Sequence, residues 1–204
     1  IVNPHATRVT TTRRDEVVRR LGEDHDLTVV ATTHRGHATE LARHAVCAGA
    51  ECVAVLGGDG TLNEAVAALA GTDCRLLVLP GGSTNVFART IGVPDDLTDA
   101  TSTMLAALDA GSVRRIGLGA VTAEGPAGGA EERAFTFHTG IGWDAALVSV
   151  VERHARLKPR LGHGVFVYAG LRTFFGSYDR RAPHFHVEID GDDGVETIED
   201  GYFA

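Results

Sequence analysis

Several residue types are scarce in this chain, and each scarcity narrows the classes of protein to which it can belong. Its 204 residues include one lysine, Lys158, and three cysteines, and aromatic side chains amount to only 6%. No apolar run approaches the roughly 18–20 residues that a membrane-spanning helix needs. No basic n-region with a long apolar stretch opens the sequence, so we predict no signal peptide. The cysteines lack metal-ligand spacing and give no disulfide framework, which fits the reducing cytoplasm.

The charge of the chain has one prevailing sign. Acidic residues outnumber basic ones and leave a formal net charge of −8. A surface of this charge disfavours a polyanion, so we expect no nucleic-acid partner. Hydrophobic residues make up 44% and charged residues 23%, as in ordinary globular proteins. The length suffices for one large domain or two modest ones.

The first half of the chain alternates short apolar runs with segments of helical spacing. Continuous apolar runs are typical of parallel strands that are buried on both faces. Alternation of strand and helix predicts an α/β domain, over residues 1–111, in which helices cover a parallel sheet. The loops after the strands then share one edge of the sheet, where ligands bind. The expected strands are Ile1-Val2, Leu27–Val30, Cys52–Leu56 and Leu76–Leu79, and the expected helices are Arg13–Leu21, Thr39–Ala48 and Leu62–Ala70.

The pattern changes near residue 112. Arg133–Thr139 and His184–Asp190 alternate polar and apolar residues, as half-buried antiparallel strands do. The intervening residues 121–132 are expected to form a long hairpin loop. We therefore predict a second, β-rich domain over residues 112–204.

This second domain is also expected to contain helices, at Asp144–His154 and Val165–Phe175, and a turn at Gly191–Gly194. The sequence stops at Ala204 inside a predicted strand, so we expect the domain to be incomplete at its C-terminus. An unpaired strand edge invites pairing with a second copy, which makes a homodimer an expected association.

A glycine-rich turn, Gly57–Glu64, is the most informative segment. It directly follows the apolar run Cys52–Leu56, and its glycines allow positive φ angles and a close approach of a ligand. Thr61 and Glu64 have capping-box spacing, so we predict that a helix begins at Thr61. Free N–H groups at such a helix start bind phosphate. The alternative is a strand-to-helix turn without a ligand, which would leave Asp59 without an obvious structural purpose.

A second loop, Pro80–Asn85, follows the run Leu76–Leu79 in the same way and is expected beside the first. Its hydroxyl and amide side chains suit phosphate or ribose. The alternative is a plain capped helix start. The first loop is not followed by the Lys-Ser/Thr pair of the nucleotide-binding P-loop, because it contains no lysine.

Together these segments resemble the catalytic domain of the bacterial diacylglycerol kinase and sphingosine kinase family. Gly57–Asn63 is GGDGTLN and Gly81–Ala88 is GGSTNVFA, and Asn3-Pro4 and Gly36–Ala38 match in order and spacing. NAD kinases share the first loop, and phosphofructokinases have similar loops, but the second loop and the opening Asn-Pro separate this chain from both. The resemblance implies a phosphofructokinase- and NAD-kinase-like fold, with ATP and Mg²⁺ as cofactors.

The resemblance also implies which residues contact ATP. Ser83 stands where relatives commonly have Thr, and Ala6-Thr7 stands where they often have Ser-Gly. Asp59, the only carboxylate of the first loop, is the implied catalytic residue. It would either hold Mg²⁺ on the ATP phosphates or orient the accepting hydroxyl, and we favour the metal-linked role. The implied ATP contacts are Asn3, Pro4, His5, Ala6, Thr7, Thr32, Gly57, Gly58, Asp59, Gly60, Thr61, Leu62, Asn63 and Ser83.

The activity that the resemblance implies is transfer of the γ-phosphoryl group of ATP to a lipid hydroxyl, most readily diacylglycerol, which gives phosphatidic acid. The family's metal-associated Asp and general base lie further toward the C-terminus, so we expect them beyond residue 204 and expect these 204 residues alone to be inactive. Asp190-Gly191 and Asp200-Gly201 are interpreted as turn residues. Two alternatives stay open: an NAD or other small-molecule kinase, and a non-catalytic nucleotide-binding module.

Residues 151–181 carry seven basic side chains against two acidic ones, a local charge of +5, together with several aromatic residues. Such a stretch suits docking onto an anionic leaflet. We therefore expect a cytoplasmic protein that is peripheral at the inner membrane face and contacts the membrane through this stretch. The alternative is a core helix flanked by solvated arginines.

Overall fold

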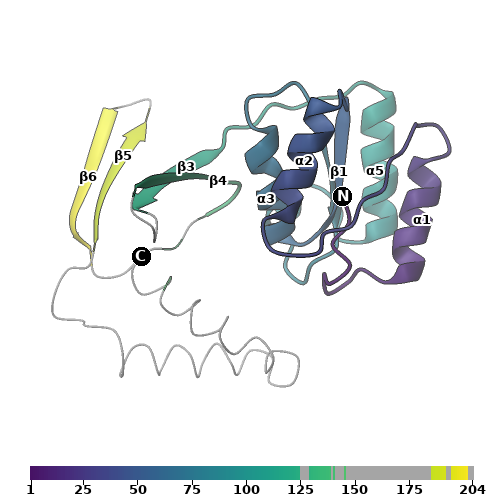
Figure 1. The fold of residues 1–204 in the computed structure, drawn as a ribbon, viewed down its shortest axis with the longest axis horizontal. Helices are drawn as coiled ribbons and strands as arrows, with labels where there is room; N and C mark the ends of the chain where they lie inside the picture. The colour runs from purple at the N-terminus through teal and green to yellow at the C-terminus, as the bar shows by residue number, and fades with distance from the viewer. Residues whose placement is uncertain (125–128, 139, 141–144, 146–184, 192–193, 202–204) are drawn as a thin grey trace, which may run out of the picture. The chain divides into compact units, whose positions relative to one another are not determined.

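The computed structural model describes residues 1–124, 129–138, 140, 145, 185–191 and 194–201. The chain divides into two compact units, residues 1–138 and 139–204 (Figure 1). Apart from Ala145, the predicted helices Asp144–His154 and Val165–Phe175 lie outside the described residues, as does the whole basic stretch 151–181. The functional division at residue 112 stays a prediction.

The first unit is built on two parallel strands, β1 (Cys52–Gly57) and β2 (Arg75–Pro80), paired with Val55 opposite Val78. Val2 extends this sheet through parallel bridges to Leu56 and Ala31. These pairings confirm the predicted parallel arrangement.

The predicted strand Leu27–Val30 is wrong in extent. Only one parallel bridge forms there, between Ala31 and Val2, supported by a bond from the Val2 N–H to the Val30 carbonyl. Val29 is 45% exposed, so this segment is not buried on both faces as a central strand would be.

Helices cover both faces of this sheet, as Figure 1 shows. Alternate residues of a strand point to opposite faces of the sheet, so each strand contributes side chains to two hydrophobic cores. On one face Val53, Val55 and Val78 pack with Ala42, Leu62, Ala65 and Val66; on the other Leu56, Leu77 and Leu79 pack with Val17, Leu21 and Leu97. The helices are α1 (Thr11–Leu21), α2 (His37–Cys47), α3 (Asp59–Leu69), α4 (Val86–Thr90) and α5 (Leu97–Asp109).

Helix α5 has no counterpart among the predicted segments. The sequence nevertheless contains a signal for its start, the N-cap residue Asp96. Its side chain accepts hydrogen bonds from the N–H groups of Thr98 and Asp99. Among the described residues, no helix combines the length and the apolar character that crossing a bilayer requires.

Two antiparallel hairpins complete the described chain: β3 (Gly119–Glu124) with β4 (Ala130–Phe135), and β5 (Phe185–Gly191) with β6 (Gly194–Gly201). The second hairpin agrees with the predicted strand, and Gly191 pairs with Gly194, while residues 192 and 193 of the predicted turn lie outside the described residues. The first corrects the predicted loop over 121–132, since strand pairing continues to Glu124 opposite Ala130 and leaves a much shorter connection.

Candidate functional site

A cavity of about 550 Å³ opens at the edge of the sheet where the strands of the first unit end. Its volume lies within the range of roughly 300–1,000 Å³ that is typical of small-molecule sites. Four chain segments form its wall: the start of the chain, the loop after Ala31, and the loops that follow β1 and β2. The cavity therefore lies at the sheet edge where the sequence predicted that ligands bind.

Ten of the residues implied as ATP contacts line this cavity: Asn3, His5, Ala6, Thr7, Thr32, Gly58, Asp59, Gly60, Thr61 and Ser83. Four others, Pro4, Gly57, Leu62 and Asn63, are not part of its lining. Leu62 is buried in the core, and the Asn63 side chain bonds to the hairpin strand β4. The contact of any of them with ATP stays a prediction.

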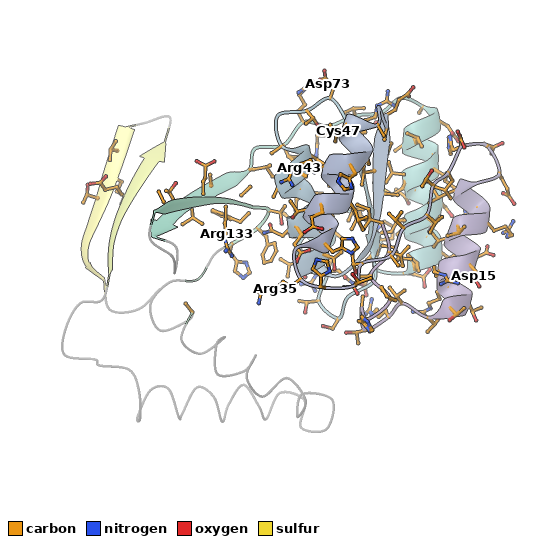
Figure 2. All side chains as sticks on the ribbon, viewed as in Figure 1. Asp15, Arg35, Arg43, Cys47, Asp73 and Arg133 are labelled. Atoms are coloured by element: carbon orange, nitrogen blue, oxygen red, sulfur yellow. The ribbon has the colours of Figure 1, made fainter. Side chains whose placement is uncertain are left out.

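The structure adds six residues to the lining: Thr33, His34, Arg35, Glu64, Gly82 and Thr84. Thr33–Arg35 directly follow Thr32 in one loop, so the position of Thr32 at the predicted edge could have pointed to them. Figure 2 shows Arg35 beside the start of α2, at the end of the unit opposite Asp73 and Cys47.

The two glycine loops touch each other through their backbones. The Gly81 N–H donates to the Gly57 carbonyl over 2.8 Å, and a Cβ placed on Gly82 would lie 2.7 Å from the Gly58 Cα. None of the glycines in these loops has a positive φ. The predicted positive φ angles are therefore wrong, and Gly58, Gly81 and Gly82 instead permit close packing of one loop on the other. The close approach of a ligand stays a prediction.

Asp59 joins the first loop to the helix that follows the second. Its Oδ1 accepts a bond of 3.1 Å from the N–H of Phe87, in the first turn of α4. Asn85, which precedes α4, has φ +48 and gives no side-chain cap, because its amide bonds to the N–H and carbonyl of Gly82. Asp59 therefore caps α4 from a different helix, which supplies the structural purpose that the sequence did not reveal.

The predicted capping box at Thr61 and Glu64 is wrong, because both side chains bond elsewhere. Helix α3 begins at Asp59 after the extended Gly58. Thr61 Oγ1 accepts from Asn3 Nδ2 over 2.8 Å, and Glu64 Oε2 accepts from the Ala38 N–H of α2 over 3.3 Å. Glu64 thus caps α2, whose own N-cap residue is a glycine without a side chain.

The second loop is held by a chain of polar contacts behind the cavity. Asn85 is only 3% exposed, and its Nδ2 donates to Asp95 Oδ1 over 3.1 Å. The other Asp95 oxygen accepts from the Arg8 guanidinium over 2.7 Å. The bond from Arg8, followed by that from Asn85, lowers the pKa of the Asp95 carboxyl. Asp95 is therefore ionised at neutral pH and can hold both partners.

The electrostatic character of the cavity follows from its helix start. Leu62 makes the first intrahelical bond of α3, to the Gly58 carbonyl, so the N–H groups before it have no partner within the helix. Such groups, together with the positive end of the helix dipole, attract anions. The Arg35 side chain lies at the same wall. The arrangement suits a phosphorylated ligand.

His34 also lines the cavity and stacks on His37, with ring centroids 4.6 Å apart and planes 11° from parallel. The Thr33 N–H donates to His37 Nδ1, so that nitrogen acts as an acceptor. No group of three or more metal-ligating side chains occurs in the part of the chain that the structure describes.

Comparison with protein-family models decides the affiliation of the chain. The model of the diacylglycerol kinase catalytic domain matches residues 1–121, more than half of the sequence. The chain belongs to this family. The match ends inside β3 and so includes the whole sheet, both glycine loops and the cavity.

Individual lipid kinases are similar to parts of the chain. A diacylglycerol kinase of Bacillus subtilis is 44% identical over 78 residues, covering 37% of this chain and 26% of that protein. A protein of Pseudomonas fluorescens named "Probable lipid kinase YegS-like" is 33% identical over 184 residues, covering 86% of this chain and 56% of the relative. The chain thus spans between about a quarter and somewhat over half of the length of these relatives.

A solved structure of a diacylglycerol kinase from Bacillus anthracis is 31% identical to this chain, with a TM-score of 0.48. The similarity covers 52% of this chain and 40% of the solved one.

Proposed function

We propose that this chain is the nucleotide-binding part of an ATP- and Mg²⁺-dependent lipid kinase. The enzyme transfers the γ-phosphoryl group of ATP to a hydroxyl of a diacylglycerol-like lipid and forms phosphatidic acid. One observation carries the proposal: in a chain of the diacylglycerol kinase family, the N-terminus of α3 and both glycine loops open on the same cavity.

The lining fits a nucleoside triphosphate. Backbone N–H groups at the start of α3 suit phosphate oxygens, and hydroxyl groups suit phosphate or ribose. Arg35 adds a permanent positive charge at the wall. The cavity hydroxyls belong to Thr7, Thr32, Thr33, Ser83 and Thr84.

The carboxylates of the cavity fit a magnesium ion that is bound mainly to phosphates. Mg²⁺ usually takes one or two protein carboxylates, substrate phosphates and water. Asp59 uses Oδ1 to cap α4, and its second oxygen has no hydrogen bond to another described residue. Asp59 and the ATP phosphates would hold the ion, and the bound ion would neutralise charge on the phosphates.

Phosphoryl transfer asks mainly for positioning and charge neutralisation from the protein. A bond forms between the lipid hydroxyl oxygen and the γ-phosphorus, the bond from that phosphorus to the bridging oxygen breaks, and ADP leaves. Residues 1–138 would bind and orient the triphosphate. The group that accepts the hydroxyl proton is expected outside the 204 residues.

We expect the 204-residue chain to bind Mg·ATP at one site but not to phosphorylate diacylglycerol, because it covers 56% of a lipid kinase that it matches along most of its own length, and the resemblance implies a general base in the remainder. Titration calorimetry measures the binding, and transfer of radiolabel to diacylglycerol in mixed micelles measures turnover. Replacing Ser83 with Ala removes one expected hydrogen bond and should weaken ATP binding about two- to tenfold. Ser102→Ala removes a hydroxyl on α5, remote from the cavity, and serves as the matched control.

Absence of ATP binding would contradict the proposed function. Phosphorylation of NAD in place of lipid by the complete protein would favour a small-molecule kinase. Clear lipid phosphorylation by the 204 residues would show that they already contain the catalytic acids.

We also propose peripheral membrane contact through residues 151–181, on the basis of their composition. Replacing Arg153, Arg156, Lys158 and Arg160 with Gln should strongly weaken sedimentation with phosphatidylserine vesicles, since each basic residue near such a surface contributes about 1 kcal/mol. The matched control removes the same charge from α1, by changing Arg13, Arg14, Arg19 and Arg20 to Gln. Equal sedimentation of both variants, or no salt dependence, would favour the core-helix alternative.

A further inference from the structure

Asn63 uses both ends of its side-chain amide to hold the β3–β4 hairpin. It lies one turn after Asp59 on α3, so the two residues share a face of the helix. Its Nδ2 donates to the Ala134 carbonyl over 3.1 Å, and its Oδ1 accepts from the Thr136 N–H over 3.1 Å. The Thr136 hydroxyl lies 3.4 Å from the same oxygen.

These bonds have the form of strand pairing. Ala134 and Thr136 are two residues apart, so their backbone groups point to the same side of the extended chain. A residue of a parallel neighbouring strand would donate to one such carbonyl and accept from the N–H two residues later. The Asn63 amide takes the place of that residue.

Apolar packing anchors the same hairpin at its base. Leu118 precedes β3 and Phe137 follows β4, and both pack against the core cluster that contains Leu62 and Val66 of α3. Helix α3 therefore carries the cavity wall at its first turn and the hairpin contact at its second. A movement of α3 would therefore displace β4, because Asn63 is hydrogen-bonded to the Ala134 carbonyl of that strand.

We propose that Asn63 is a positioning residue that couples ligand binding at the start of α3 to the placement of the β3–β4 hairpin. The coupling rests on the proposed nucleotide-binding function, whereas the clamp of Asn63 on the hairpin does not. The clamp holds the end of the described hairpin against the helix whose first turn lines the cavity.

Hydrogen exchange of the Thr136 amide in the 204-residue chain tests both parts. In the absence of nucleotide, Asn63→Ala should speed this exchange at least tenfold, and Asn63→Asp, which keeps the Oδ1 acceptor only, should have an intermediate effect. Mg·ATP, at a concentration that saturates each variant according to its own measured affinity, should slow the exchange at least threefold in the wild type but not in Asn63→Ala. Thr136→Val keeps the backbone N–H and should behave like the wild type.

Equal exchange in the wild type and Asn63→Ala would overturn the clamp. ATP binding that leaves Thr136 exchange unchanged in the wild type would overturn the coupling. A tenfold loss of ATP affinity in Asn63→Ala with unchanged exchange would make Asn63 a nucleotide contact instead, and overturn the proposal. A wild-type chain that binds no ATP would overturn the proposed function and the coupling together, while the exchange rates without nucleotide still decide the clamp.

Discussion

Replacing Asp59 with Asn is expected to slow lipid phosphorylation by the complete kinase more than a hundredfold while the fold stays intact. Asn keeps an oxygen that accepts the Phe87 N–H, so α4 remains capped. It lacks the negative charge that would hold Mg²⁺ against the ATP phosphates. A hundredfold loss corresponds to about 2.7 kcal/mol of transition-state stabilisation. Radiolabel transfer to diacylglycerol measures the rate, and thermal unfolding followed by circular dichroism measures the fold.

Two further variants separate charge from structure at this position. Asp59→Ala also removes the cap of α4 and should lower the free energy of unfolding by about 0.5–2 kcal/mol, which Asp59→Asn should not. Asp73→Asn removes a carboxylate that is almost fully exposed at the opposite end of the unit from Arg35 (Figure 2), and should leave the rate unchanged. Turnover of Asp59→Asn within about tenfold of the wild type would refute the catalytic role.

Gly60→Ala and Gly82→Ala are expected to separate ligand binding from stability. The first should weaken ATP binding without loss of stability, and the second should lower stability. A Cβ on Gly60 meets no protein atom within 4 Å, and alanine favours the helix, so the free energy of unfolding should rise by up to about 1 kcal/mol. The same methyl group would enter the proposed phosphate position, so ATP affinity should fall tenfold or more. A Cβ on Gly82 would overlap the Gly58 backbone and should lower the free energy of unfolding by about 1–3 kcal/mol, with or without ATP.

Urea denaturation and calorimetric titration of the two variants provide these values, with each variant as the control for the other. Unchanged ATP affinity in Gly60→Ala would mean that the phosphates do not lie at the first turn of α3. Full stability of Gly82→Ala would mean that the two loops can separate without cost.

The sequence predicted the elements that depend on local pattern. Continuous apolar runs identified β1 and β2, because residues such as Val55 and Leu56 serve the cores on opposite faces of the sheet. The segment Leu27–Val30 has a similar pattern, yet only a single bridge forms beside it and Val29 is exposed, because an apolar run does not by itself specify a pairing partner. The predicted capping box was wrong because Thr61 and Glu64 bond to Asn3 and Ala38 in other segments. Helix α3 starts two residues earlier, at Asp59.

By itself, the sequence determined the parallel α/β architecture, the order of the glycine loops and the sheet edge at which they meet, because periodicity and chain order are properties of neighbouring residues. Only the tertiary structure decided what the polar residues of α3 do. Glu64 bonds to a residue 26 positions away, Asp59 to one 28 positions away and Asn63 to one 73 positions away. Hydrogen bonds need partners within about 3 Å, and only folding brings residues so far apart in the chain to that distance.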